Sequence, residues 1–470
     1  MPADPWLGDA CGLVEEFRAG RLSPPEALEE CLSAIGSSSL DAVCHLDVDR
    51  ARERAASADV SAPFGGVPFG VKELEAVEGW PFTEASLVFA ERRATRDDTS
   101  VTRLRATGAV LVAQTTASEF GGINCTSTAL HGTTRNPWDP TRTPGGSSGG
   151  TAAAVAGGLL PIATGSDGGG SIRIPAGFSG LFGLKATYGR IPKGSGVGVE
   201  PLTSVLGCLS RSVRDTARYL DCCNGYDLHD PLSLPAIGGL EAGLGSRDLG
   251  GLRLAVLPDL STARVRSEVA DLVAGAGAEL AKHAGLQVVA VEAHLPPLED
   301  EWAMAGQVAF LADLGDAYPG CLEQLSPEMR LGLDLVRERF SLEDAARLEG
   351  YRRLLNEAMA ELFEQADFVV AATNPDVAFT AEGPPPSSLP GADLVAEFGF
   401  VRAIMNNAAL TAPSNLNGSP AMSLPLCQLD GLPVGVQVLS AHHREPLLLE
   451  LALVAEREMG WPLVAPGSPS

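Results

Sequence analysis

Residues 144–150 read Pro-Gly-Gly-Ser-Ser-Gly-Gly, and residues 165–173 read Gly-Ser-Asp-Gly-Gly-Gly-Ser-Ile-Arg. Both stretches lie in a block, 120–209, that is dense in glycine, serine and threonine and shows helical periodicity only over 150–159. Glycine concentrated in one block of a folded chain is typical of backbone that approaches a ligand closely or takes positive φ. The sequence therefore indicates a ligand site in this block.

Outward from this block, helical and strand patterns alternate. Helices are predicted over 8–19, from Ser23 onward with Pro24-Pro25 in its first turn, and over 47–59, 99–107, 266–283 and 444–458, with a helix-rich stretch over 299–366. Strands are predicted over 67–71, 109–114, 252–257, 286–291 and 368–372. Ser212 and Asp215 have the spacing of a capping box that opens a helix running to about Cys223. The runs 419–424 and 433–439 flank Asp430-Gly431, which predicts a hairpin.

The composition excludes several classes of protein. The 470 residues carry 34 Lys+Arg against 59 Asp+Glu, for a formal net charge of −25. Such acidity repels phosphate backbones and argues against nucleic-acid binding. Hydrophobic residues at 45% and charged residues at 20% exclude a disordered chain. Because no repeat or long linker interrupts the pattern, we expect one α/β domain over 1–470.

Cysteine usage and the N-terminal residues indicate a compartment. The nine cysteines include no C-x-x-C pair, so neither a disulfide framework nor a zinc site is indicated. The N-terminus lacks the basic and apolar regions of a signal peptide. The longest run of small apolar residues, 151–164, is too short to span a bilayer. We expect a cytoplasmic protein with no membrane contact.

Two familiar motifs fit the glycine-rich block poorly. The pattern Gly145-x-Ser147-x-Gly149 matches the nucleophile elbow of α/β-hydrolases, but that elbow follows a buried strand, and residues 139–144 are polar and contain two prolines. Residues 165–171 could form an anion nest for a phosphate, but no Gly-Lys-[Ser/Thr] follows them.

An oxyanion nest fits the block better. The N–H groups of Gly168, Gly169, Gly170 and Ser171 could converge on the negative oxygen of a tetrahedral intermediate, with Ser171 as nucleophile. None of the seven histidines stands in a motif-like setting, so a buried, neutral lysine is the other available base. The chain has only four lysines, Lys72, Lys185, Lys193 and Lys282. Because arginine cannot act as a base at neutral pH, this scarcity favours Lys72.

Residues 66–190 resemble the amidase signature family. The family pattern runs Gly-x-Pro-x-x-x-Lys, Gly-Gly-Ser-Ser-Gly-Gly and Gly-[Thr/Ser]-Asp-x-Gly-Gly-Ser-Ile-Arg, and this chain carries it at 66–72, 145–150 and 165–173. Residues 183–190, 417–425 and 431–437 also match. The likeness fails mainly between 230 and 398. Taken alone, Ser147 and Ser148 would be turn residues and Arg173 a structural charge; the order and spacing of three motifs outweigh those interpretations.

The resemblance implies a fold and a site. The fold is an α/β structure with a mixed β-sheet core covered by helices on both sides. The implied catalytic residues are Ser171 as nucleophile, Ser147 as a bridging serine after a cis peptide bond, and Lys72 as general base. Gly121 is implied to contact substrate through its backbone. The resemblance gives supporting roles to Ser148, Asp167 and Arg173.

Three positions depart from the family pattern without removing a catalytic group. Glu73 replaces the usual aspartate, Ala186 replaces a proline, and Ser179 stands where cysteine is common. The segment 230–398 is variable and helix-rich, and we expect it to shape the substrate entrance. Its Trp302, Phe310 and Phe340, with Phe120, are equally good pocket or core residues.

These features predict hydrolysis of the C–N bond of a small-molecule carboxamide, giving carboxylate and amine or ammonia through an acyl-enzyme, with no metal or cofactor. The same chemistry would serve carbamates or esters. An alternative is the A subunit of a glutamyl-tRNA amidotransferase, which usually carries glutamine where this chain has Ile174. A catalytically silent binding protein is the alternative from a different class. A homodimer is an expectation of the family alone.

Overall fold

The computed structural model describes residues 5–194, 203–292, 294–297, 300–339 and 341–469. The side chains of residues 300–305, which include Trp302, and of residue 339 lie outside that description, as does all of Phe340. The main sheet contains β1 Val43–Leu46, β2 Pro68–Lys72, β3 Val110–Thr115, β6 Ile162–Asp167, β7 Phe182–Lys185, β8 Val205–Ser210, β9 Arg253–Val256, β10 Gln287–Val288, β11 Phe368–Ala372, β14 Ala421–Leu429 and β15 Leu432–Leu439. Two small hairpins are β4 Ser127–Thr128 with β5 Gly132–Thr133, and β12 Ser388–Leu389 with β13 Ala392–Asp393.

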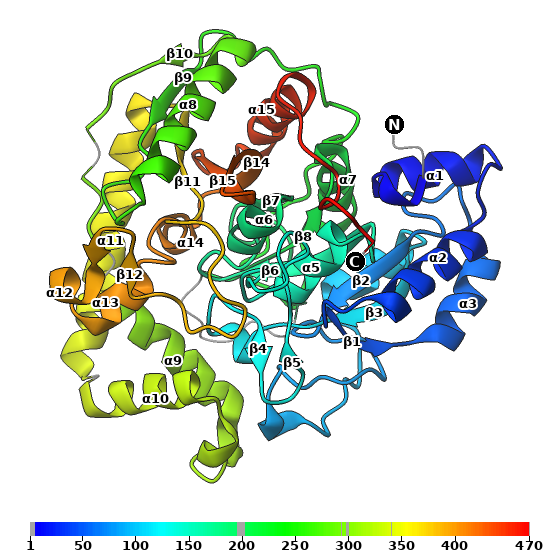
Figure 1. The fold of residues 1–470 in the computed structure, drawn as a ribbon, viewed down its shortest axis with the longest axis horizontal. Helices are drawn as coiled ribbons and strands as arrows, with labels where there is room; N and C mark the ends of the chain where they lie inside the picture. Colours follow the sequence, from blue (N-terminus) through cyan, green and yellow to red (C-terminus); the bar gives the residue numbers. More distant parts are fainter. Residues whose placement is uncertain (1–4, 195–202, 293, 298–299, 340, 470) are drawn as a thin grey trace.

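The eleven-stranded sheet is mixed, with the order β1-β3-β2-β6-β8-β7-β14-β15-β11-β9-β10 (Figure 1). Parallel pairs lie towards its two ends: β2 with β3 and β6, and β9 with β10 and β11. The strands from β6 through β8, β7, β14 and β15 to β11 pair antiparallel. The expected mixed sheet is therefore confirmed, and its middle is built from the glycine-rich block and the C-terminal hairpin.

The helices are α1 Ala10–Arg18, α2 Pro24–Ser37, α3 Val48–Ala56, α4 Thr99–Ala106, α5 Gly149–Ala156, α6 Arg173–Ser179, α7 Val213–Cys223, α8 Ser267–Ala284, α9 Asp300–Leu314, α10 Pro327–Arg339, α11 Leu342–Gln365, α12 Leu394–Phe398, α13 Phe400–Met405, α14 Ala412–Asn417 and α15 Glu445–Glu458. Single 3-10 turns span Pro5–Leu7, Leu87–Phe89, Glu119–Gly121, Gly315–Ala317 and Leu322–Gln324.

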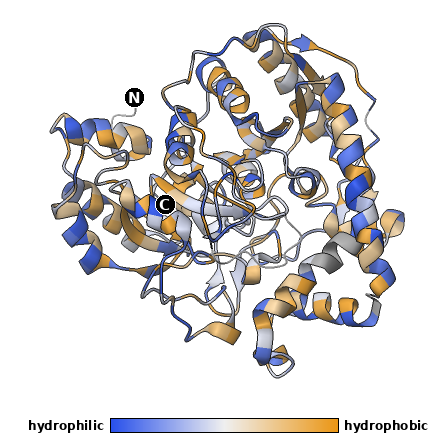
Figure 2. Cartoon of the chain, turned by 180° about the vertical axis from the view of Figure 1, so that it is seen from behind, coloured by the Kyte–Doolittle hydropathy of each residue, from blue (hydrophilic) through white to orange (hydrophobic). Residues whose placement is uncertain are grey.

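Helices α6 and α8 cover opposite faces of the sheet. Gln437 of β15 lies opposite Ala371 of β11 and accepts a hydrogen bond from Arg173 at the start of α6. Val370, the residue before Ala371 in β11, packs against Gly277 of α8. Because successive residues of a strand point to opposite faces, the two helices lie on different sides. In Figure 2 the outer helices alternate between hydrophilic and hydrophobic colours along their length.

The sequence patterns did not predict the short strands inside the glycine-rich block. Strands β6, β7 and β8 lie at the centre of the sheet, yet they contain Gly165, Gly183 and Gly207, which break the expected apolar run. At each of these glycines an added Cβ would come within 2.8 Å of a neighbouring side chain. Glycine is used here because neighbouring layers lie too close for any side chain.

The predicted start of α7 is half right. Ser212 accepts a hydrogen bond from the Asp215 N–H, as a capping residue does. The Asp215 carboxylate does not return the bond to Ser212; it accepts the N–H groups of Ala10 and Cys11 at the start of α1. The carboxylate therefore joins two helix N-termini, a long-range contact that local spacing cannot reveal.

Helices α9 and α10 project from the body of the molecule (Figure 1). Between them lies a small hydrophobic cluster, separate from the main core, which we call the satellite core: Phe310, Leu314, Cys321, Leu325, Met329 and Leu333. Among the described residues, no helix combines the length and the apolar character needed to cross a membrane.

The Arg211 side chain ties the N-terminal segment to the sheet. It is fully buried, and its guanidinium donates to the carbonyls of Trp6, Gly8, Val155 and Leu160 at 2.7–3.2 Å. We expect Arg211→Met to lower the free energy of unfolding by about 3–5 kcal/mol, because buried carbonyls lose their donor.

Arg18 provides the matched control, since it also donates to three carbonyls but is exposed. Arg18→Met should lower the free energy of unfolding by about 1 kcal/mol or less, because water replaces the lost donor. Urea denaturation of both variants measures the difference; equal losses would contradict this account of Arg211.

Candidate active site

Lys72 ends β2 with its amine fully buried. Its Nζ lies 2.8 Å from the Ser147 Oγ, 2.9 Å from the Ser148 Oγ and 2.9 Å from the Ser166 Oγ. Burial lowers the pKa of the Lys72 amine to about 7, although nearby carboxylates, led by Glu75, oppose the shift. An amine with such a pKa is neutral in a large fraction of molecules near pH 7, so it can accept a proton.

Ser147 and Ser148 are held between Lys72 and the segment 118–126. The peptide bond between Gly146 and Ser147 is cis, as the resemblance implies. The Ser118 N–H donates to the Ser147 carbonyl at 3.2 Å. Gly121, with φ +71°, lies so close that an added Cβ would be 3.4 Å from the Ser147 Oγ. The structure thus brings Lys72, Ser147, Ser148 and Gly121 together.

Ser171 lies in the turn between β6 and α6 and is 7% exposed. Gly170, before it, has φ +132°, and an added Cβ there would be 2.4 Å from the Thr411 Oγ1. Within the described part of the chain, the N–H groups of Gly168, Gly169 and Ser171 donate no hydrogen bond.

The structure corrects one part of the expected nest. The Gly170 N–H donates to the Asp167 carboxylate at 2.7 Å, so it is not free for an oxyanion. The same carboxylate accepts the N–H groups of Ile172 and Arg173 at 3.2 and 3.3 Å. Asp167 therefore shapes the turn by holding these three N–H groups, whereas those of Gly168, Gly169 and Ser171 donate to no described residue.

Asp167 and Arg173 form a fully buried ion pair beneath the turn. Burial opposes ionisation of Asp167, but the Arg173 guanidinium outweighs it and holds the pKa of that carboxyl well below its usual range. Arg173 also donates to partners on α14 and β15 and just before α14, at 2.6–3.0 Å: the Thr411 carbonyl, Ser414, Asn415 and Gln437. Both residues therefore hold the turn in place.

One group of metal-ligating side chains occurs in the described part of the chain. The ligand atoms of Cys44, Glu73 and His131 lie within 4.8 Å of one another. Glu73 is the residue after Lys72, and His131 lies in the β4–β5 hairpin. No local pattern in the sequence indicates this group, because its members come from three separate segments.

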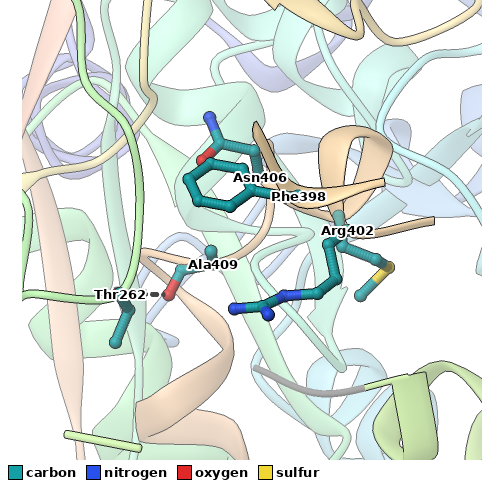
Figure 3. Close-up of a pocket in the computed structure, with 6 residues that line it drawn as sticks. Thr262, Phe398, Arg402, Asn406 and Ala409 are labelled. Atoms are coloured by element: carbon teal, nitrogen blue, oxygen red, sulfur yellow. Dashed lines mark hydrogen bonds between the residues drawn. The ribbon is translucent and has the colours of Figure 1, made fainter. Parts of the chain in front are cut away.

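A small open pocket lies apart from these residues (Figure 3). It is lined by Thr262, Phe398, Arg402, Met405, Asn406 and Ala409. The Thr262 hydroxyl donates to the Ala409 carbonyl at 2.9 Å across it. None of the residues expected from the sequence lines this pocket.

Sequence reasoning missed several side chains around the site. Ser166 contacts the Lys72 amine, and Thr164 accepts the Lys72 N–H at 2.9 Å. Thr411 donates to the Gly169 carbonyl at 2.6 Å. Ser166 and Thr164 lie inside a recognised motif and beside it, so their closeness to Lys72 follows once β2 and β6 are known to be neighbours. Thr411 carries no local signal.

Comparison with known proteins gives consistent matches over most of the chain. A family model described as Amidase matches residues 26–449. The chain is 30% identical to the A subunit of the glutamyl-tRNA(Gln) amidotransferase of Lacticaseibacillus paracasei, over 97% of this chain and 98% of that protein. It is also 30% identical to an acylamidase of Rhodococcus erythropolis, over 97% and 96%. The structure of a bacterial aryl acylamidase superposes with a TM-score of 0.89 at 26% identity, over 97% of each chain.

Two glycines in the turn before Ser171 form a matched pair for mutation. Gly170→Ala places a Cβ against Thr411 at a strained φ, whereas a Cβ at Gly168 would meet only atoms 3.7 Å or more away. We expect Gly170→Ala to lower the free energy of unfolding by about 1–3 kcal/mol. We expect Gly168→Ala to change it by less than about 0.5 kcal/mol. Chemical denaturation tests this; a larger loss for Gly168→Ala contradicts it.

Proposed function

The chain belongs to the amidase signature family of C–N bond hydrolases, and from that premise we propose that it cleaves small-molecule carboxamides to carboxylate and amine or ammonia through an acyl-enzyme on Ser171. One observation carries the proposal: a fully buried lysine amine lies 2.8 Å from the hydroxyl of Ser147 and 2.9 Å from that of Ser166, on the strand that leads into the turn holding Ser171.

In this mechanism the proton moves along a short relay. Ser171 attacks the carbonyl carbon and gives its proton to Ser147, which passes its own proton to neutral Lys72. A neutral amine has two N–H donors and one lone pair, so among its three serine contacts it can accept a proton from one while donating to two. The proton returns through Ser147 to the leaving amine, and water then attacks the acyl-enzyme.

The oxyanion is assigned to the turn before Ser171. The N–H groups of Gly168, Gly169 and Ser171 donate to no described residue, which supports their use as donors. The Gly170 N–H is not assigned to the oxyanion, because it donates to the Asp167 carboxylate. Gly121, against Ser147, is assigned to contact substrate through its backbone.

We assign the substrate entrance to the segment 230–398, and in particular to α9 and α10. The ring of Phe310 lies 4.5 Å from that of Phe120, and Met329 packs on Gly122. The Ser326 N–H donates to the buried Glu119 carboxylate at 2.9 Å. These contacts hold the two helices against the residues flanking Gly121, and they favour a substrate with an apolar group.

A second candidate is glutamine hydrolysis as the A subunit of an amidotransferase, which the 30% identity to such a protein favours. Against it stands Ile174, which is buried in an apolar cluster with Phe178 and Ala378. An apolar side chain at this position offers no amide to a polar substrate. Amide hydrolysis without a second protein is therefore the stronger assignment.

Variants of the three proposed catalytic groups test the mechanism. A fluorophosphonate probe should label the wild type and not Ser171→Ala. Lys72→Arg keeps a positive charge, but a guanidinium cannot act as a base, so this variant should lower the rate of hydrolysis at least about 1000-fold. Ser147→Ala should lower the rate by a similar factor. Ser148→Ala is the control, since Ser148 contacts Lys72 at a similar distance but has no relay role; it should cost about tenfold or less.

The measurement is turnover on aliphatic, aryl and peptide amides, with glutamine included, using the purified chain alone. Full hydrolysis by Ser171→Ala would show that another residue is the nucleophile. Activity restricted to glutamine would favour the amidotransferase assignment.

The pH dependence follows from the lysine. Because the base acts in its neutral form and burial places the pKa of Lys72 near 7, labelling of Ser171 should rise as the pH increases through about 7 and then level off. Glu75→Gln should move the midpoint to lower pH, because the Glu75 carboxylate raises the pKa of Lys72. Labelling rates measured between about pH 5.5 and 9 check this, and a rate that falls with rising pH contradicts it.

A further inference from the structure

An imidazole and a thiol lie close to the same oxygen of a buried carboxylate. The Glu73 Oε2 lies 2.8 Å from the His131 Nε2 and 3.8 Å from the Cys44 Sγ. The three residues come from separate segments: Cys44 from β1, Glu73 from the end of β2, and His131 from the β4–β5 hairpin. A thiol, an imidazole and a carboxylate are the ligands that zinc and similar transition metals take from proteins.

We propose that Cys44, Glu73 and His131 form a binding site for a divalent transition-metal ion of the zinc class. This site goes beyond the proposed function, which uses no metal. The ion binds the Cys44 Sγ, one Glu73 oxygen and the His131 Nε2, and leaves a fourth position for water or another small ligand.

The geometry needs only small movements. In a tetrahedral site with bonds of about 2.0–2.3 Å, neighbouring ligand atoms lie about 3.3–3.8 Å apart. The sulfur-to-oxygen distance of 3.8 Å already fits, and the histidine nitrogen has to move back from the oxygen by about half an ångström. The sulfur and the nitrogen lie within 4.8 Å of each other, so binding draws them together by about an ångström at most. His131 can do so, because its side chain is 20% exposed in a short hairpin, whereas Glu73 is fixed at 1% exposure.

Glu73 is well anchored for this role. Its second oxygen, Oε1, accepts the Ala117 N–H at 2.7 Å, which leaves Oε2 as the oxygen that faces the other two ligands. The Thr83 hydroxyl also donates to Oε2, at 3.2 Å, and gives the ligated oxygen a hydrogen bond of the kind that orients metal ligands. Glu73 stands where the family usually has aspartate, and its side chain is longer by one methylene. The added length brings its carboxylate to Cys44 and His131.

The charges balance on binding. A neutral imidazole, a carboxylate and a thiol take up the dication, and the thiol releases one proton to solvent. The product carries two negative ligands and two positive charges on the metal, so the site is neutral. No oxidant or reductant takes part.

Co²⁺ is the probe, because a thiolate ligand gives it an ultraviolet charge-transfer band and four-coordination gives it strong visible bands. The purified chain of 470 residues, stripped of metal with a chelator, should bind one equivalent of Co²⁺ and show both bands, and Zn²⁺ should abolish them by displacement. Cys44→Ser should lose the charge-transfer band, and His131→Ala should weaken binding at least about tenfold.

Cys427→Ser is the matched control. Cys44 and Cys427 are both half-buried thiols that donate to a main-chain carbonyl, that of Gln114 and that of Leu272, but Cys427 lies outside the cluster. This variant should keep both bands. Zn²⁺ should also raise the midpoint of thermal unfolding of the wild type and of Cys427→Ser, but not of Cys44→Ser.

The proposal is overturned if the wild type shows no charge-transfer band, or if that band survives in Cys44→Ser. Loss of the band in Cys427→Ser overturns it equally, since the thiolate would then lie elsewhere. If Cys44→Ser does not fold, the His131→Ala variant is sufficient as a test: an unchanged affinity for Co²⁺ in that variant would overturn the proposal. None of these readouts depends on hydrolysis, so failure here leaves the proposed function to its own test.

Discussion

The buried pair of Asp167 and Arg173 is the interaction on which the site depends. Asp167 receives main-chain N–H groups from the turn before α6 and two bonds from the Arg173 side chain. Arg173 in turn reaches α14 and β15, which lie more than 200 residues further along the chain. Removing one member of such a pair costs about 3–5 kcal/mol, because the other charge stays buried. The turn that carries Ser171 is thus held by the whole centre of the sheet.

The lysine and the ion pair show opposite uses of burial. Arg173 is buried with the Asp167 carboxylate and other acceptors around its guanidinium, so its positive charge is compensated. Lys72 is buried among three hydroxyl groups that carry no charge, so desolvation works against its ammonium form. Lys185 is also buried, and desolvation with the nearby Arg173 charge lowers its pKa to about 7 as well. In this protein burial therefore lowers the pKa of both lysine amines.

How far the sequence predicts the structure depends on the range of the interaction. Lys72, Ser147 and the turn around Ser171 could be found because motifs keep their order and spacing, and the hairpin at Asp430-Gly431 because a turn is local. Contacts between distant segments left no such pattern: Asp215 caps α1 instead of completing its own box, Asp167 takes the Gly170 N–H, and Thr411 closes over the turn. The central strands β6 to β8 were missed because tight packing between layers required glycine where apolar residues were expected.

The satellite core between α9 and α10 has a consequence for dynamics. Its six buried side chains pack mainly on one another and touch the rest of the protein through Phe120, Phe89 and Val88, with Met329 also packed on Gly122. A cluster with its own small core and few links to the sheet opens at a lower free energy than the molecule as a whole. We therefore expect amide hydrogens of α9 and α10 to exchange with solvent while those of β6 and β15 stay protected. The residues beside Gly121 would then be uncovered and covered again without any unfolding of the sheet that carries the serines.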